Sequence, residues 1–333
     1  MAMRAHGCRA RRLAAGAVLV ACAAAAAGGE QFIPVYEAEV GGPSVPASYD
    51  SGASPYTGIG RYEGRGTCTA FFLATALPGQ EYLEEAPAYA VTSGRCAANP
   101  GADDVLVNLP GSGSIIFKYF ADSGRQRVSV LVARIAYATV KGRDLAILEL
   151  AIPYRELVQK LVRPWRVPHF PQVVPGDLIA VVSAPRTSPA QEDVLRLALC
   201  RMEGVAPVVV EHNWQLLDTT LNRCRDVAPA SSGAPVLSVI DRYAIGVVST
   251  TTIDADHVTR CALGHPCEPT RGGTRSRRDT NYVTRLAGIN ACFNDRHRFD
   301  ARGPGCPLDP GTQAGTTPPS TGAVNRMFDR VLY

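Results

Sequence analysis

Residues 90–96 read Ala-Val-Thr-Ser-Gly-Arg-Cys, a short apolar strand followed by a Ser-Gly turn, an arginine and a cysteine. Earlier in the chain, residues 66–73 read Gly-Thr-Cys-Thr-Ala-Phe-Phe-Leu and indicate a second strand with its own cysteine. The residue that decides the chemistry of this region is Arg95. A guanidinium stays protonated at any working pH and has no lone pair with which to accept a proton, so Arg95 cannot act as a general base.

Three later stretches complete the pattern. Residues 142–148, Gly-Arg-Asp-Leu-Ala-Ile-Leu, place Asp144 at the start of an apolar strand. Residues 230–236, Ala-Ser-Ser-Gly-Ala-Pro-Val, place Ser232 in a turn of small residues, and residues 245–249, Ile-Gly-Val-Val-Ser, indicate another strand. Because Gly, Ser and Pro are common turn residues, the stretch around Ser232 taken alone also fits an ordinary turn that leads into a strand.

In this order and at these separations, the stretches resemble the chymotrypsin family of serine endopeptidases over roughly residues 58–293. The resemblance implies an all-β fold of two six-stranded Greek-key β-barrels, the trypsin-like double barrel, with few short helices. It also implies that Asp144 is the triad aspartate and Ser232 the nucleophile. Ser249 would line the substrate cleft and support Asp144, and Arg95 would stand at the position of the triad histidine.

The same resemblance assigns the oxyanion hole to the backbone N–H groups of Ala230 and Ser232. Two residues of this turn depart from the family, because Ala230 replaces the usual glycine and Ser231 the usual aspartate. Asp226 lies where trypsin keeps the carboxylate that selects Lys or Arg substrates. A plain loop aspartate is the simpler interpretation of Asp226, since the local cysteine pattern differs.

With an arginine at the histidine position, we predict that Arg95 forms an ion pair with Asp144 and occupies the site. The histidines outside the N-terminal leader are His169, His212, His257, His265 and His297. His212 is the least remote replacement base, although an ordinary surface histidine is the simpler interpretation. Loss of a triad histidine costs roughly a million-fold in turnover, so we predict impaired catalysis at Ser232.

Ten cysteines in a chain of 333 residues predict disulfides formed in an oxidising compartment. Setting aside Cys8 and Cys22 in the leader, the order of the others suggests that neighbours pair: Cys68 with Cys96, Cys200 with Cys224, Cys261 with Cys267, and Cys292 with Cys306. Eight cysteines allow on the order of a hundred connectivities, so the sequence leaves the pairing open. No paired Cys-x-x-Cys or close Cys/His spacing is present, and we predict neither a metal site nor a cofactor.

Short β-branched and apolar runs, broken by Pro, Gly and Asp, fill the middle of the chain and are typical of an all-β barrel or sandwich. The predicted strands include residues 129–135, 144–150, 178–182, 205–210, 236–240 and 244–248, and only residues 155–162 and 284–291 are predicted as short helices. The predicted segments are a leader (1–29), a lead-in (30–57), an N-terminal barrel (58–165), a C-terminal barrel with its extension (166–306) and a low-complexity tail (307–333). The boundary between the barrels falls in a proline-rich stretch.

The N-terminus has the layout of a bacterial secretory signal, with arginines ahead of the apolar run at residues 13–21. Residues 19–22, Leu-Val-Ala-Cys, also resemble a lipobox, in which Cys22 would become the lipidated first residue, and plain secretion fits equally well. We expect the protein in the bacterial periplasm, in the outer envelope or secreted, with a membrane contact only through such an anchor. Without the four leader arginines the 34 basic residues fall to 30 and equal the 30 acidic ones, so the charge gives no indication of nucleic-acid binding.

Two functions follow from these observations. The first is an exported trypsin-like serine peptidase homologue that has lost catalysis, a monomeric pseudoprotease that binds a peptide or protein in its cleft. The alternative is an active serine endopeptidase that uses Ser232 with an unrecognised base. The reactivity of Ser232 separates the two. Small-molecule or metal binding has no supporting motif.

Overall fold

The computed structural model describes residues 38–47, 54–76, 85–170, 174–184, 194–227, 231–253, 255 and 259–309. The predicted leader with Cys22, most of the tail, Ala230 and His257 lie outside the described residues. In the described part, two seven-stranded antiparallel sheets account for most of the ordered structure. Only two α-helices are present there, α1 (Gly94–Ala97) and α2 (Tyr154–Gln159), and both are short.

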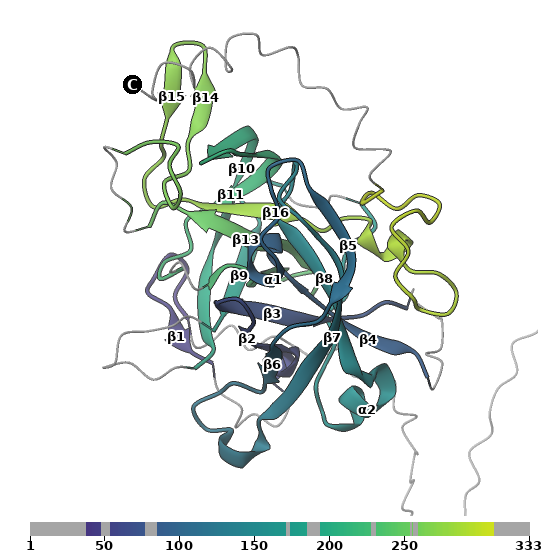
Figure 1. The fold of residues 1–333 in the computed structure, drawn as a ribbon. Helices are drawn as coiled ribbons and strands as arrows, with labels where there is room; N and C mark the ends of the chain where they lie inside the picture. Colours follow the sequence, from purple (N-terminus) through teal and green to yellow (C-terminus); the bar gives the residue numbers. More distant parts are fainter. Residues whose placement is uncertain are drawn as a thin grey trace, which may run out of the picture. The chain divides into compact units, whose positions relative to one another are not determined.

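The first sheet closes on itself as a barrel of six strands (Figure 1). Around the barrel the order is β2-β3-β4-β8-β7-β6, with β6 returning to β2, and β5 is added at the edge of β7. The strands are β2 (Ile59–Glu63), β3 (Thr67–Leu73), β4 (Pro87–Thr92), β5 (Val105–Pro110), β6 (Ser114–Phe117), β7 (Val128–Thr139) and β8 (Leu145–Pro153). Buried and exposed residues alternate in the first half of β7 and then give way to a buried run, because that strand passes from a solvated edge into the core.

The second sheet repeats this topology. Its ring runs β9-β10-β11-β16-β13-β12 and closes from β12 to β9, while β1 is added at the edge of β10. The strands are β1 (Val45–Pro46), β9 (Leu178–Ser183), β10 (Arg196–Glu211), β11 (Trp214–Asn222), β12 (Pro235–Ser238), β13 (Ala244–Thr251) and β16 (Asn281–Arg285). A separate hairpin of β14 (Glu268–Thr270) and β15 (Gly273–Arg275) lies beside β10.

Numbering the six ring strands of each barrel along the chain gives the same spatial order in both, first-second-third-sixth-fifth-fourth. This is a Greek-key arrangement, because the chain crosses over after the third strand instead of continuing to its neighbour. The predicted all-β fold of two six-stranded barrels is therefore confirmed, with one additional edge strand on each.

One buried apolar cluster contains residues of both barrels. From the first barrel it includes Tyr89 and Tyr137, and from the second Val182 and Val247, all almost fully buried. The interior of each barrel holds a further cluster, built around Phe72 in the first and Val236 in the second. The apolar sides of the two sheets therefore share one buried core.

Four disulfides join neighbouring cysteines along the chain: Cys68–Cys96, Cys200–Cys224, Cys261–Cys267 and Cys292–Cys306. The pairing suggested by the cysteine order is confirmed. Such a set of bridges persists in an oxidising environment, which indicates an exported or extracellular protein.

The predicted helix at residues 284–291 is wrong. Thr284 and Arg285 continue β16 and pair with Val247 and Gly246 of β13, and helical turns begin only at Ile289, where a 3₁₀ turn runs to Cys292. Pairing inside the barrel outweighs the local spacing of apolar residues that suggested a helix. Further 3₁₀ turns span Pro55–Gly58 and Gly124–Gln126.

The segment after β16 packs against the first barrel. The rings of Phe293 and Phe299 contact Tyr89 and Tyr137, respectively, with centroids 5.1 and 6.0 Å apart. The Phe299 N–H also donates to the Tyr89 hydroxyl at 3.2 Å. The C-terminal extension thus ties the end of the second barrel back to the first.

Candidate functional site

Arg95 lies on α1, directly after β4, in a position fixed by its neighbours. A Cβ added at Gly94 would lie 2.1 Å from the Thr139 carbonyl oxygen, so only glycine allows α1 to approach β7 this closely. The next residue, Cys96, is tied to β3 through Cys68. The sequence Ser-Gly-Arg-Cys therefore folds into one helical turn that directs the Arg95 side chain toward the second barrel.

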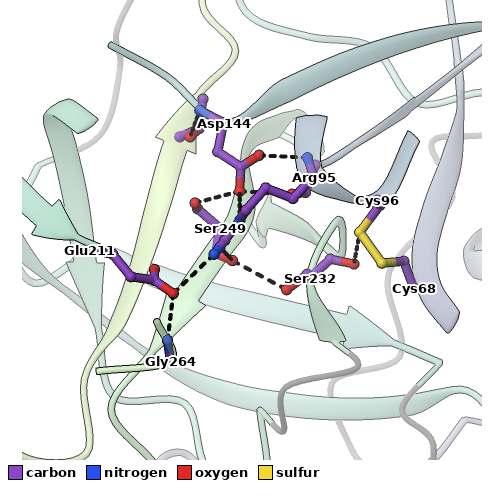
Figure 2. A network of polar contacts seen from close by, with 10 residues as sticks. Cys68, Arg95, Cys96, Asp144, Glu211, Ser232, Ser249 and Gly264 are labelled. Atoms are coloured by element: carbon purple, nitrogen blue, oxygen red, sulfur yellow. Dashed lines mark hydrogen bonds and ion pairs between the residues drawn. A yellow bond between two sulfur atoms is a disulfide. The ribbon is translucent and has the colours of Figure 1, made fainter. Parts of the chain in front are cut away.

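The Arg95 guanidinium donates to three groups (Figure 2). Nε donates to Asp144 Oδ2 at 3.0 Å, Nη1 to Glu211 Oε1 at 2.9 Å, and Nη2 to the Ser249 carbonyl oxygen at 2.7 Å. The guanidinium also lies over the Trp214 ring, 4.9 Å from its centroid. Only 20% of the side chain is exposed. Arg95 therefore connects a carboxylate of the first barrel to a carboxylate and a backbone carbonyl of the second.

Asp144, the residue before β8, is completely buried and its carboxylate is heavily bonded. Besides the Arg95 Nε, Oδ2 accepts from the hydroxyls of Ser93 at 2.7 Å and Ser249 at 2.8 Å, and Oδ1 accepts from the Arg95 backbone N–H at 3.1 Å. The Asp144 N–H donates to Thr284 Oγ1 at 3.2 Å. The ion pair with Arg95 and the support from Ser249 are those expected from the sequence.

Glu211 is the second acid partner of Arg95, and the sequence did not indicate it. It ends β10 with only 2% of its side chain exposed. Its Oε1 also accepts from the Gly264 N–H at 2.8 Å, within the loop closed by Cys261–Cys267. The sequence does show an acidic residue at the end of an apolar strand. It does not show that Glu211 pairs with Arg95, because the two residues are 116 positions apart.

The charge of Arg95 is strongly held. Burial alone would lower its pKa, but the Asp144 and Glu211 carboxylates outweigh burial and raise the pKa above its ordinary value. An arginine in this state neither gives up nor accepts a proton during a reaction. At this position the site holds a fixed cation between two acids.

Ser232 lies in the turn that precedes β12. Its Oγ donates to the Ser249 carbonyl oxygen at 3.2 Å (Figure 2). Its own carbonyl oxygen accepts from the Thr69 N–H at 2.9 Å. The turn requires Gly233, which has φ +86° and whose missing Cβ would lie 2.1 Å from the Thr69 carbonyl. The Ser231 hydroxyl is buried without a hydrogen-bond partner in the described residues. Ala230, the other predicted oxyanion donor, is outside them.

A cavity of about 330 Å³ opens beside Ser232. Its polar lining includes Arg95, Glu211, Ser232 and Ser249. The loop closed by Cys261–Cys267 contributes Leu263, Gly264 and His265. The remaining lining residues are Val248, Thr250, Thr251, Ile253 and Ala255. The volume falls in the range of small binding pockets, so the cavity has room for a side chain or a short peptide segment.

Two sequence candidates do not line this cavity. Asp226 is exposed in a left-handed turn, and its Oδ2 accepts from the Ser44 N–H at 2.7 Å, which fastens the lead-in segment to the second barrel. The ring of His212 packs edge-on against Trp214 with centroids 6.0 Å apart. His265, which the sequence gave no reason to prefer, is the histidine that the structure brings to the cavity.

In the described residues, no group of three or more His, Cys, Asp and Glu side chains is arranged to hold a metal ion. No described helix is long and apolar enough to cross a membrane.

Comparisons with known proteins found structural likenesses only. No protein-family model matches the sequence, and no curated protein matches it. Human heparin binding protein superposes with a TM-score of 0.47 at 14% identity, covering 76% of this chain and 93% of that one. Serine protease AL20 from an extremophilic microorganism superposes with a TM-score of 0.42 at 13% identity, covering 70% of this chain and 92% of that one. The protease Anisep from Arthrobacter nicotinovorans superposes with a TM-score of 0.42 at 15% identity, covering 70% of this chain and 91% of that one.

Proposed function

We propose that this chain is a non-catalytic homologue of the chymotrypsin-like serine peptidases that binds a peptide or protein segment in the cavity beside Ser232. The observation that carries the proposal is the position of Arg95, which bonds the buried Asp144 carboxylate from the place where a general base would stand. A peptidase of this family needs a neutral imidazole there to take the serine proton. The guanidinium cannot take it.

The cavity supports a binding role. Leu263 is 61% exposed at its edge, and backbone around Ser249 and Thr251 runs along the cavity in β13. An extended peptide gains affinity from backbone hydrogen bonds to such a strand and specificity from a side chain placed in a pocket.

We further propose that the protein acts outside the cytoplasm, in the bacterial periplasm, in the outer envelope or after secretion. Four disulfides support an oxidising location. The proposal includes a monomer with a peptide or protein partner and no nucleic-acid partner, supported by the near balance of 34 basic and 30 acidic residues.

Fluorophosphonate labelling of the folded, disulfide-bonded protein tests the loss of catalysis. We expect no adduct on the native protein by intact mass, while an active serine peptidase in the same tube is labelled to completion. Arg95→His is expected to increase labelling, and Arg95→His with Ser232→Ala to abolish that increase. An adduct on the native protein that disappears in Ser232→Ala would contradict the proposal.

The second candidate function, an active endopeptidase, rests on His265, which lines the same cavity as Ser232. It predicts that the native adduct forms and that His265→Ala prevents it. Under our proposal His265→Ala changes nothing in the labelling experiment.

Peptide selection tests the binding role directly. Peptides enriched from a random library on the native protein should lose affinity for Leu263→Arg, which blocks the cavity edge. They should bind normally to the matched control Leu131→Arg on β7, since Leu131 is 66% exposed on the first barrel and does not line the cavity. Failure to enrich any peptide, or equal binding to both variants, would count against a cleft-binding function.

A further inference from the structure

A second and larger cavity, of about 560 Å³, lies where the two barrels meet behind Asp144. One wall is the segment before β8, and the other is formed by β11 and the end of β16. The walls are joined by backbone: the Gly142 N–H donates to the Gln215 carbonyl at 3.1 Å, and the Leu217 N–H donates to the Gly142 carbonyl at 2.8 Å. These two hydrogen bonds fix the segment before β8 against β11 at the border of the cavity.

Three cationic side chains line this cavity: Lys141, Arg143 and Arg285. Arg285 Nε is buried and has no hydrogen-bond partner within the described residues. Arg143 forms no ion pair with a described acid within 4.0 Å. A buried guanidinium N–H without an acceptor is costly, and an acceptor supplied by a ligand would remove that cost.

The environment of Arg143 also favours a bound anion in this cavity. Burial lowers the pKa of Arg143 below its ordinary value, and electrostatic effects of Tyr137 and Asp218 offset this lowering only in part. A bound anion would restore the stabilisation that the protein itself does not provide. Arg143 directly precedes the buried Asp144, yet its own side chain is directed into this cavity and not into the Arg95 cluster.

The remaining lining narrows the ligand chemistry. Asp103 and Asp218 contribute two negative charges against the three positive ones, so the lining carries one net positive charge. Leu217, Ala287 and Pro307 add apolar surface. A guanidinium fork matches the planar geometry of a carboxylate, and the volume is far larger than a single inorganic ion requires.

We propose that this cavity is a binding site for a small organic carboxylate, with Arg143 and Arg285 holding the carboxylate and the apolar wall holding the body of the molecule. The site is separate from the cavity beside Ser232 and does not depend on whether Ser232 is reactive. Its position between the barrels means that an occupant contacts both of them.

Ligand-observed NMR on the full, disulfide-bonded protein tests the site with benzoate, with the neutral and equally shaped benzamide, and with phosphate at constant ionic strength. We expect benzoate to bind and benzamide to bind at least about tenfold more weakly, because charge-assisted hydrogen bonds are lost. Phosphate, which gains nothing from the apolar wall, should also bind more weakly. Equal binding of benzoate and benzamide, or phosphate binding as tightly as benzoate, would overturn the proposal.

Variants locate the binding. Arg143→Gln and Arg285→Gln should each weaken benzoate about tenfold, whereas Arg271→Gln should change it less than about twofold because Arg271 is exposed in the β14–β15 turn. Equal effects of all three substitutions would exclude this cavity. If a variant fails to fold, crystals of the unaltered protein soaked in 4-bromobenzoate decide the matter: the anomalous bromine peak is expected beside Leu217 and Pro307, and a peak elsewhere only would refute the site.

Discussion

Arg95 is positioned by Gly94 on one side and by the disulfide of Cys96 on the other. Its guanidinium donates hydrogen bonds to two buried carboxylates and one backbone carbonyl. The Arg95 side chain has a raised pKa, and its Nε, Nη1 and Nη2 atoms each donate to a protein acceptor. At the scale of one residue, the site holds a fixed ion-pair network centred on the Arg95 guanidinium.

Replacing Arg95 by Ala should destabilise the fold strongly. Asp144 is fully buried and Glu211 is 2% exposed, so the substitution leaves two carboxylates without their cation. Breaking a buried ion pair by removing one partner costs about 3–5 kcal/mol. We expect a loss of this size in the free energy of unfolding, measured by urea denaturation monitored by circular dichroism.

The matched control is Arg271→Ala, an exposed arginine whose loss should change stability by less than about 0.5 kcal/mol. Adding Glu211→Gln to Arg95→Ala should recover part of the loss, because one of the two stranded charges is removed. A loss below about 1 kcal/mol for Arg95→Ala would show that the network contributes little to stability.

The sequence predicted one half of this network. The Arg95 and Asp144 pair was accessible because both residues belong to stretches with a recognisable order. Glu211 was not, since it reaches Arg95 only after β10 and α1 are brought together from opposite barrels. His212 was preferred over His265 for the same reason, because the sequence does not show which histidine lies near Ser232 after folding. The loop closed by Cys261–Cys267 places His265 at the cavity.

At the scale of elements, strands were easier to predict than helices. The predicted runs at residues 129–135, 178–182 and 244–248 all fall inside β7, β9 and β13. The helix α1 was not predicted because four residues carry no detectable 3.6-residue period. The error at residues 284–291 has the opposite cause, a helix-like spacing overruled by pairing with β13.

The β14–β15 hairpin carries a pH-dependent element. The Glu268 carboxylate accepts from Arg275, Arg277 and the Tyr282 hydroxyl. Burial would raise the pKa of Glu268, but hydrogen bonds and charges from the two arginines lower it below its ordinary value of 4.5. A depressed pKa in the folded state gives stability that is fully present above the ordinary pKa and is lost as the pH falls through the lower, folded value.

Glu268→Gln should therefore lower stability at neutral pH and flatten its dependence on pH. The difference from the native protein should shrink as the pH drops below 4.5, because the native carboxylate becomes protonated and loses the same interactions. Unfolding midpoints measured across this range provide the check. Glu156→Gln serves as control, since Glu156 pairs with Lys160 and both side chains are about half exposed. Parallel pH curves for native and Glu268→Gln would contradict the assignment.

At the scale of the whole molecule, the described chain repeats one six-stranded topology twice, although no repeat is visible in the sequence. The repeat lies in the order of strand pairing, which different apolar residues can satisfy equally well. The two copies are joined by Arg95, by the Thr69 N–H bond to the Ser232 carbonyl, by Asp144 to Thr284, and by a shared apolar cluster. These contacts predict that neither barrel is stable without the other.

The two tryptophans allow this to be measured. Trp165 hydrogen-bonds to the backbone of β3 in the first barrel, and Trp214 begins β11 in the second. Since the sequence contains only these two, Trp214→Phe leaves a probe of the first barrel and Trp165→Phe a probe of the second. If the contacts between the barrels make unfolding cooperative, fluorescence and circular dichroism should give one coincident urea midpoint within each variant. A fluorescence midpoint that departs from the circular dichroism midpoint in either variant would show instead that the barrels unfold separately, and that Arg95 and the shared cluster do not couple them.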